Sequence, residues 1–162
     1  MASTTFSGPV TSTNGFVGAV VSSTPVNATA STLTVTQATH GGRFITLNRA
    51  AGIAVTLPAA TGTGTIYEFV IGTSITSNST TIKVANASDT MTGSAYVISD
   101  NTAAVLGYKT GASDDTITFN GTTLGGLKGD TVRVVDVGTN LFSVQVLSQA
   151  TGTEATPFSA TV

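Results

Sequence analysis

The stretch Thr131–Leu147, TVRVVDVGTNLFSVQVL, decides the fold. Apolar residues occupy every second position on both sides of the turn Gly138-Thr139-Asn140, at Val132, Val134, Phe142, Val144 and Val146. A period of two residues is typical of a β-strand, and a short turn of this composition predicts a hairpin. The opposite positions include Val135 and Val137, so both faces are apolar. We therefore expect this hairpin to be central in its sheet, or covered on one side by another subunit.

The same period recurs along the chain from residue 32 onward. Besides the hairpin strands at Thr131–Val137 and Leu141–Leu147, it predicts seven strands: Thr32–Thr36, Arg43–Leu47, Ile53–Leu57, Thr65–Ile71, Thr80–Ala85, Ala95–Ser99 and Asp115–Phe119. Turns rich in Gly and Asn separate them, and no segment favours a helix. These nine short strands predict an all-β domain over residues 32–150. We expect an antiparallel β-sandwich or barrel in which hairpins dominate.

The segment before this domain carries no fixed charge. Charged residues make up 9% of the chain, against about 25% in ordinary soluble domains, and the first of them is Arg43. Residues 1–31 are mainly Ser, Thr, Ala, Gly and Pro, with too few apolar residues to build a core. Pro9 and Pro25 favour an extended backbone. We expect an extended, flexible N-terminal arm over residues 1–31 and a C-terminal tail over residues 151–162.

Composition argues against several classes of function. The net charge is −2 and the six Lys and Arg residues are scattered singly, so no basic stripe is available to bind nucleic acid. The chain has no Cys, which removes disulfides and thiolate metal sites. The apolar run Phe16–Val21 is short and has no Lys or Arg before it. We therefore expect neither a signal peptide nor contact with a membrane.

Candidate catalytic side chains are sparse. His40 is the single His, and no G-x-S-x-G motif accompanies it. We interpret His40 as a turn residue whose ring caps nearby backbone groups, with pH sensing as the alternative. Glu68 lies inside a strongly apolar strand, and we expect it to face solvent or to pair with Arg43 or Arg49. A glycosidase would need two facing carboxylates, so we expect that the chain is not an enzyme.

Four carboxylates lie near predicted turns: Asp114, Asp115, Asp130 and Asp136. They could offer oxygen ligands to Ca²⁺, but no D-x-[DN]-x-[DN]-G loop is present. We interpret them as loop residues and expect no metal and no cofactor, with Ca²⁺ as the alternative. Gly62-Thr63-Gly64 and Gly125–Gly129 resemble phosphate loops only superficially, because neither matches G-x-x-x-x-G-K-[ST] or precedes a predicted helix. We interpret both as hairpin turns.

A weak internal echo links THGG (Thr39–Gly42) with TLGG (Thr123–Gly126), each followed by two predicted strands. In a chain so rich in Thr and Gly we interpret the echo as chance, with duplication as the alternative. A solenoid requires at least three repeats, so none is expected.

Several stretches resemble virion proteins of tailed bacteriophages. They are ITLNRAAG (Ile45–Gly52), TLPAATGTG (Thr56–Gly64), YEFVIG (Tyr67–Gly72), VANASDTM (Val84–Met91), GTEATPFS (Gly152–Ser159) and TFSGPVTSTNGF (Thr5–Phe16). The resemblance is greatest to small capsid-decoration, or cement, proteins, which are typically trimers seated on the head lattice. It implies a homotrimer on the outer surface of a capsid, made in the host cytoplasm and bound to the major capsid protein.

The arm suggests how such a protein would bind. Fixing a residue costs about 1–2 kcal/mol of backbone entropy, so a segment of this composition orders only when a partner supplies burial and strand hydrogen bonds. We expect five capsid-binding anchors: Phe6, Val10, Phe16, Val17 and Val20. The backbone between them would extend a sheet edge of the major capsid protein. The alternatives are a phage fibre or tail module, or a carbohydrate-binding β domain, which needs exposed aromatic and acidic residues on one face.

Overall fold

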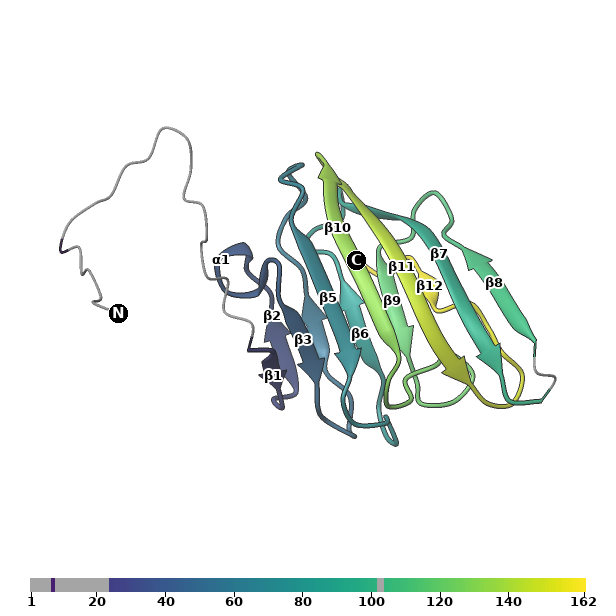
Figure 1. Cartoon of the computed structure of the whole chain (residues 1–162). Helices are drawn as coiled ribbons and strands as arrows, with labels where there is room; N and C mark the ends of the chain where they lie inside the picture. Colours follow the sequence, from purple (N-terminus) through teal and green to yellow (C-terminus); the bar gives the residue numbers. More distant parts are fainter. Residues whose placement is uncertain (1–6, 8–23, 102–103) are drawn as a thin grey trace, which may run out of the picture.

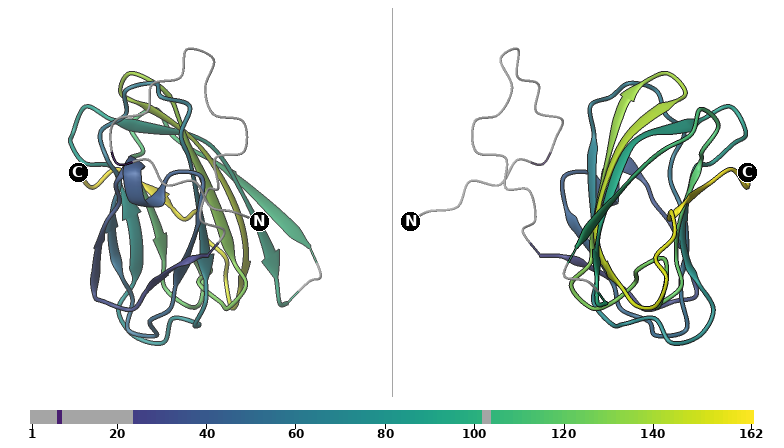
Figure 2. Two further views of the ribbon diagram at one scale, coloured as in Figure 1. Left: turned by 60° about the vertical axis from the view of Figure 1, so that its left-hand side comes forward. Right: turned by 90° about the vertical axis from the view of Figure 1, so that its right-hand side faces the viewer.

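The computed structural model of the chain describes residue 7, residues 24–101 and residues 104–162. Within these residues two β-sheets pack face to face (Figures 1 and 2). The larger sheet contains, in spatial order, β1 (Val26–Ala28), β3 (Phe44–Leu47), β5 (Ile66–Ile71), β10 (Thr131–Gly138), β11 (Leu141–Ala150), β7 (Thr90–Ser99) and β8 (Val105–Lys109). The smaller contains β12 (Phe158–Ser159), β9 (Thr116–Phe119), β6 (Thr80–Lys83), β4 (Ala54–Thr56) and β2 (Thr32–Thr34). The expected all-β sandwich is confirmed.

All nine predicted strands are present, and four elements were not predicted. Strand β1 lies inside the predicted N-terminal arm and β12 inside the predicted C-terminal tail, so the two sheets span residues 26–159. Strand β8 and the single helical turn α1 (Gln37–His40) complete the set. The helix begins at Thr36, whose hydroxyl accepts a hydrogen bond from the Thr39 N–H.

Chain topology differs most from the prediction. The strands from β1 to β6 alternate between the two sheets, and each joins its predecessor in the same sheet by parallel pairing. In the larger sheet β1 pairs with β3 and β3 with β5, and in the smaller sheet β2 pairs with β4 and β4 with β6. Residues 26–83 therefore form three successive coils, an arrangement like a short parallel solenoid, which we did not expect. Uniform antiparallel pairing is thus wrong: both sheets are mixed, and β7 also pairs with β11 in parallel.

Hairpins are correspondingly few. Among the described strands, those adjacent in the chain pair directly only at β7–β8 and β10–β11. Gly62-Thr63-Gly64 lies between β4 and β5, and Gly125–Gly129 lies between β9 and β10. Both segments cross from the smaller sheet to the larger, so the interpretation of both as hairpin turns is wrong. The hairpin β10–β11 does lie in the middle of the seven-stranded sheet, which confirms that part of the prediction.

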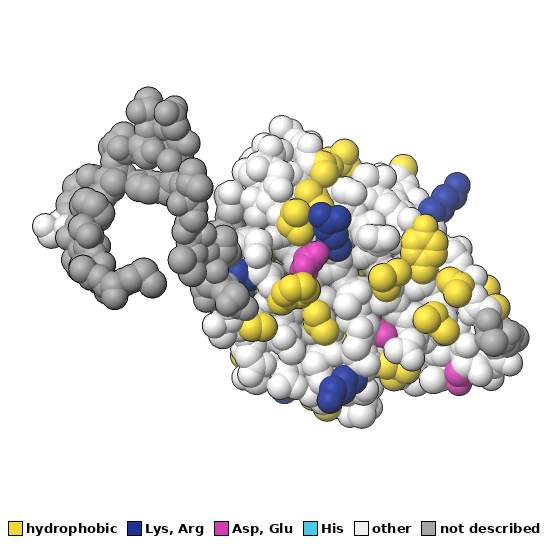
Figure 3. Space-filling model, in the orientation of Figure 1, with side chains coloured by type: hydrophobic (Ala, Val, Ile, Leu, Met, Phe, Trp, Pro, Cys, Tyr) yellow, Lys and Arg dark blue, Asp and Glu magenta, His cyan; other side chains and the backbone are white. Residues whose placement is uncertain are grey.

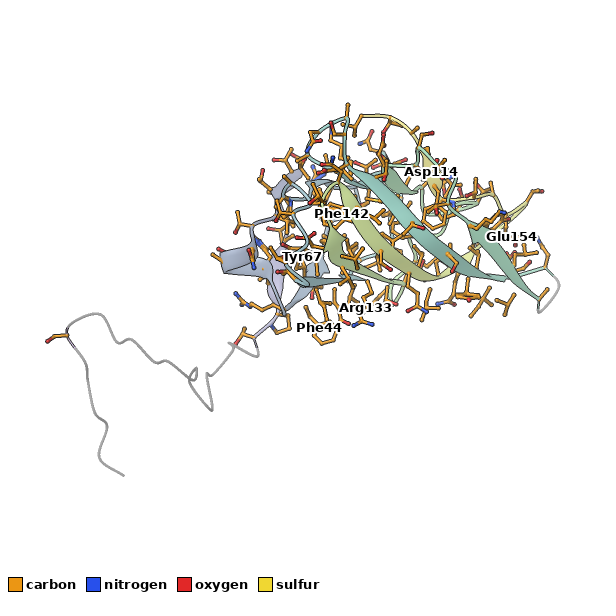
Figure 4. The ribbon with its side chains drawn as sticks, turned by 90° about the horizontal axis from the view of Figure 1, so that it is seen from above. Phe44, Tyr67, Asp114, Arg133, Phe142 and Glu154 are labelled. Atoms are coloured by element: carbon orange, nitrogen blue, oxygen red, sulfur yellow. The ribbon has the colours of Figure 1, made fainter. Side chains whose placement is uncertain are left out.

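The core lies between the sheets and is built from stacked aliphatic and aromatic side chains. Parallel register places Ala28, Leu47 and Ile71 on neighbouring strands of the larger sheet, all buried. Figure 4 shows Tyr67 and Phe142 pointing between the layers, where both are at most 1% exposed. Burying a side chain of this size contributes about 1.5–3 kcal/mol. This packing fixes the direction of every second residue, and the remaining residues of the larger sheet point to its outer face.

Candidate interaction surface

Asp136, near the end of β10, holds the loop that connects β4 to β5. Its side chain points inward and is 3% exposed. The carboxylate accepts hydrogen bonds from the backbone N–H groups of Thr61 (3.1 Å), Gly62 (2.7 Å) and Thr63 (3.0 Å) and from the Thr63 hydroxyl (2.7 Å). Burial alone would raise the pKa of Asp136, but the hydrogen bonds outweigh it and hold the pKa below the usual value. The Gly-rich loop therefore binds the Asp136 carboxylate of the same chain.

Asp130 has a similar role beside the start of β10. Its carboxylate accepts hydrogen bonds from the N–H groups of Gly126 (2.8 Å), Leu127 (3.0 Å) and Gln149 (3.0 Å). Burial raises the pKa of Asp130 above the usual value, because these hydrogen bonds compensate only part of the lost hydration. The carboxylate ties the Gly125–Gly129 loop to β11.

Asp115 fixes the C-terminal end of the chain. It accepts hydrogen bonds from the Thr116 hydroxyl (2.7 Å) and from the N–H groups of Thr161 (2.9 Å) and Val162 (3.1 Å). Burial pushes the pKa of Asp115 up, but these contacts and the charge of Lys83 bring it below the usual value. Asp114 accepts only the Gly111 N–H, at an exposed position. Asp114, Asp115 and Asp130 lie outside the strands, as interpreted, whereas Asp136 belongs to strand β10. Asp115, Asp130 and Asp136 are buried and hold neighbouring segments of the chain.

The other two candidates from the sequence are also held locally. The ring Nδ1 of His40 accepts the Thr36 N–H at 3.0 Å, so the expected backbone cap is confirmed. Glu68 faces solvent, as the first alternative expected, with its side chain 38% exposed. Its ionic partner is Arg133, at 3.7 Å between Oε1 and Nε, so the alternative of pairing with Arg43 or Arg49 is wrong. Those two arginines donate to backbone carbonyls instead. Arg133 reaches Glu68 because β5 and β10 are neighbours, which depends on strand order and not on sequence distance.

The outer face of the larger sheet, the side that points away from the smaller sheet, combines few charges with exposed apolar side chains. Strand register forms one row across it: Phe44, Glu68, Arg133, Gln145, Ser94 and Lys109. A neighbouring row carries Val70, Thr131, Leu147 and Tyr96. Phe44, Leu147, Ile98 and Val105 are all more than half exposed. Solvated sheet faces normally carry polar residues at such positions, so this face is suited to a partner.

Two hollows lie on this face. One of about 230 Å³ lies beside the ion pair and is bordered by Phe44, Val70 and Leu147. The other, of about 530 Å³, is bordered by Tyr96, Ile98 and Val105 near the opposite edge. Figure 3 shows hydrophobic side chains spread over this face around an adjoining basic and acidic pair, and Figure 4 shows Phe44 and Arg133 pointing out from the same side. The sequence signal for this surface was the apolar residues on both faces of the 131–147 hairpin.

The five predicted capsid-binding anchors, Phe6, Val10, Phe16, Val17 and Val20, lie outside the described residues. In the part of the chain that is described, no group of three or more His, Asp or Glu residues is placed to hold a metal ion. Nor does any helix there have the length and hydropathy to cross a membrane.

No family model, curated protein or solved structure matches this chain. The features of this chain that bear on function are the outer face, the buried carboxylates that hold loops and the uncharged N-terminal segment.

Proposed function

We propose that this chain is a non-enzymatic virion structural protein that decorates and stabilises a bacteriophage capsid. In this proposal residues 1–23 bind the major capsid protein, with Phe6, Val10, Phe16, Val17 and Val20 as anchors. The sandwich serves as the folded body that stays on the outer surface of the shell. The resemblance implies a homotrimer as the assembly on the capsid.

The observation that carries the proposal is the firm attachment of the N-terminal segment to the sandwich. Arg43, the first charged residue, donates hydrogen bonds from its guanidinium to the carbonyl oxygens of Thr24 (2.6 Å) and Thr39 (3.0 Å). Strand β1 then pairs with β3 at the edge of the larger sheet. A partner that binds the uncharged residues ahead of Thr24 is thereby linked directly to a folded domain, as cementing requires.

The hydrogen bonding of three buried carboxylates supports a structural role. The inward-facing carboxylates Asp115, Asp130 and Asp136 each accept three or more hydrogen bonds from the chain itself. Groups engaged in this way hold loops, and a general acid or base needs access to a substrate. Most of the exposed large apolar side chains of the described residues lie on the outer face.

The proposal is tested by measuring how tightly the protein binds phage heads that lack it. Deletion of residues 2–23 keeps β1 and should leave the melting temperature unchanged, whereas affinity for heads that lack the protein should fall by about 100-fold or more, as avidity is lost. The matched control replaces residues 2–23 with a Gly/Ser linker of equal length and should lose affinity equally. Undiminished binding by the folded, truncated protein would refute the mechanism. Copy number on intact virions, hundreds for a head protein and few for a tail fibre, separates these two locations.

A carbohydrate-binding domain is the second candidate, because the feature it requires is present. Phe44, Tyr96 and Glu68 share the outer face. However, Phe44 lies on β3 and Tyr96 on β7, and these strands are four positions apart in the sheet. The two rings are therefore separated by about 19 Å, which is too far for both to stack on one sugar ring. Glycan-array binding that is lost in both Tyr96→Ala and Glu68→Gln would establish this function in place of capsid decoration.

A further inference from the structure

We propose that the outer face of the larger sheet is a self-association surface, on which two copies of this chain pack face to face about a two-fold axis. The inference goes beyond capsid decoration and concerns the isolated protein. Its basis is the position of the single ion pair on this face, together with the apolar side chains that surround it.

Glu68 and Arg133 are direct neighbours on β5 and β10, the third and fourth of the seven strands. The nearest other charge in their row is Lys109 on β8, three strands beyond β10. The pair is therefore isolated near the middle of the sheet. Both side chains are accessible to a partner, with side-chain exposures of 51% for Arg133 and 38% for Glu68.

This arrangement is self-complementary. A two-fold axis that runs along the strands, between β5 and β10, exchanges these two strands between facing copies. Glu68 of one copy then lies opposite Arg133 of the other, and the reverse contact forms at the same time. In an adjacent row, Ile66 and Val135 are also direct partners. Ile66 of one copy therefore lies opposite Val135 of the other copy, and the reverse contact forms as well. Four alternating charges are thereby surrounded by apolar contacts.

The available area is that of a small interface, which fits a weak and reversible dimer. The axis superposes six of the seven strands, leaving β8 outside, and six strands at about 4.8 Å each give a width of about 29 Å. The axis places β1 on β7, β3 on β11 and β5 on β10, and the shorter strands of these pairs have 3, 4 and 6 residues. About 26 residues of each copy therefore overlap, and each copy buries on the order of 400 Å². A standard protein interface buries about 800 Å² per partner.

A second copy of this chain is the favoured partner for this face, because its Arg133 lies opposite Glu68 and its Glu68 lies opposite Arg133. A partner of one sign would leave either Glu68 or Arg133 opposed by like charge, at a cost of several kcal/mol. The two-fold arrangement also predicts a dimer, in contrast to the trimer expected from the resemblance, so the mass of the assembly distinguishes them.

Reciprocal charge reversal in the full chain tests the inference. Glu68→Arg places two like-charged contacts in its own dimer, and Arg133→Glu does the same with the opposite sign; each alone should weaken self-association by about 100-fold or more. An equimolar mixture restores both intermolecular contacts, while the pair within each subunit stays broken. The mixture should therefore form a heterodimer, measured by light scattering on a sizing column and by sedimentation equilibrium.

Controls separate charge from folding. Lys128→Glu changes the net charge as Arg133→Glu does, but at an exposed position in the loop between β9 and β10, and should leave the dimer intact. Glu68→Lys with Arg133→Asp gives a second reciprocal pair in case one variant folds poorly. A monomeric or trimeric wild type, dimers that persist in each single variant, or a mixture of folded variants that fails to associate would each overturn the inference. None of these results depends on binding to a capsid.

Discussion

Removal of the Asp136 carboxylate gives the sharpest test of how the loops are held. In Asp136→Ala, the N–H groups of Thr61, Gly62 and Thr63 and the Thr63 hydroxyl lose their common acceptor. The change removes no large apolar side chain, so the loss of hydrogen bonding dominates the result. We expect the free energy of unfolding to fall while the sandwich still forms.

The magnitude follows from the donors. A hydrogen bond to a charged group contributes about 1.5–3 kcal/mol, but these loop residues are exposed, and their N–H groups can regain water once the loop moves. About 1 kcal/mol for each of the three backbone donors gives a total of about 3 kcal/mol. For a chain of this size, each kcal/mol lowers the melting temperature by about 2–4 °C. The expected decrease is therefore about 6–12 °C.

Urea unfolding followed by circular dichroism, with a thermal melt alongside, measures the effect. The control Asp114→Ala removes a carboxylate with a single exposed backbone partner, Gly111, and should cost less than about 1 kcal/mol. If Asp136→Ala is as stable as Asp114→Ala, the buried carboxylate is not what holds the loop.

Three further predictions concern the rest of the fold. Acid should destabilise the protein: the folded-state pKa values of Asp136 and Asp115 are lowered, so below about pH 4 the unfolded chain binds protons first, and the free energy of unfolding falls. Asp130, whose pKa is raised, acts in the opposite direction. Urea titrations at neutral and acidic pH should show that the free energy of unfolding falls less with acid in Asp136→Asn than in the wild type. Gly93→Ala should cost about 2–4 kcal/mol in urea unfolding, because Gly93 has a φ of 153° and a Cβ there would lie 1.8 Å from the Val144 carbonyl oxygen. EDTA should leave the melting temperature unchanged, since the carboxylates suspected of binding Ca²⁺ already accept hydrogen bonds from the chain, and a clear decrease would point to a bound metal.

The sequence was sufficient for the strands that show clear alternation. Thr131–Gly138 and Leu141–Ala150 occur where the period of two predicted them, and their central position followed from apolar residues on both faces. Strand β8 was missed because Gly107 interrupts its pattern. Strand β12 has only two residues, too few to show a period.

Strand pairing could not be predicted in the same way. A turn such as Gly62-Thr63-Gly64 shows that the chain changes direction, but not which sheet the next strand joins. Here that loop leads from one sheet to the other, and its amides bind Asp136. One signal was present in the sequence: Asp136 shares the inward face of its strand with Val132 and Val134, an unusual place for a carboxylate.

Strand order also constrains when the sheet can form during synthesis. In the larger sheet, β5 and β7 are separated by the late hairpin β10–β11, so the two halves of that sheet stay unjoined until residue 150 is available. The β7–β11 pairing alone links residues about fifty positions apart, and such long-range contacts make folding slow. A nascent chain that ends before Thr131 exposes unpaired edges on both β5 and β7, which favours association with other incomplete chains. Premature termination is therefore expected to give aggregates, not a smaller folded domain.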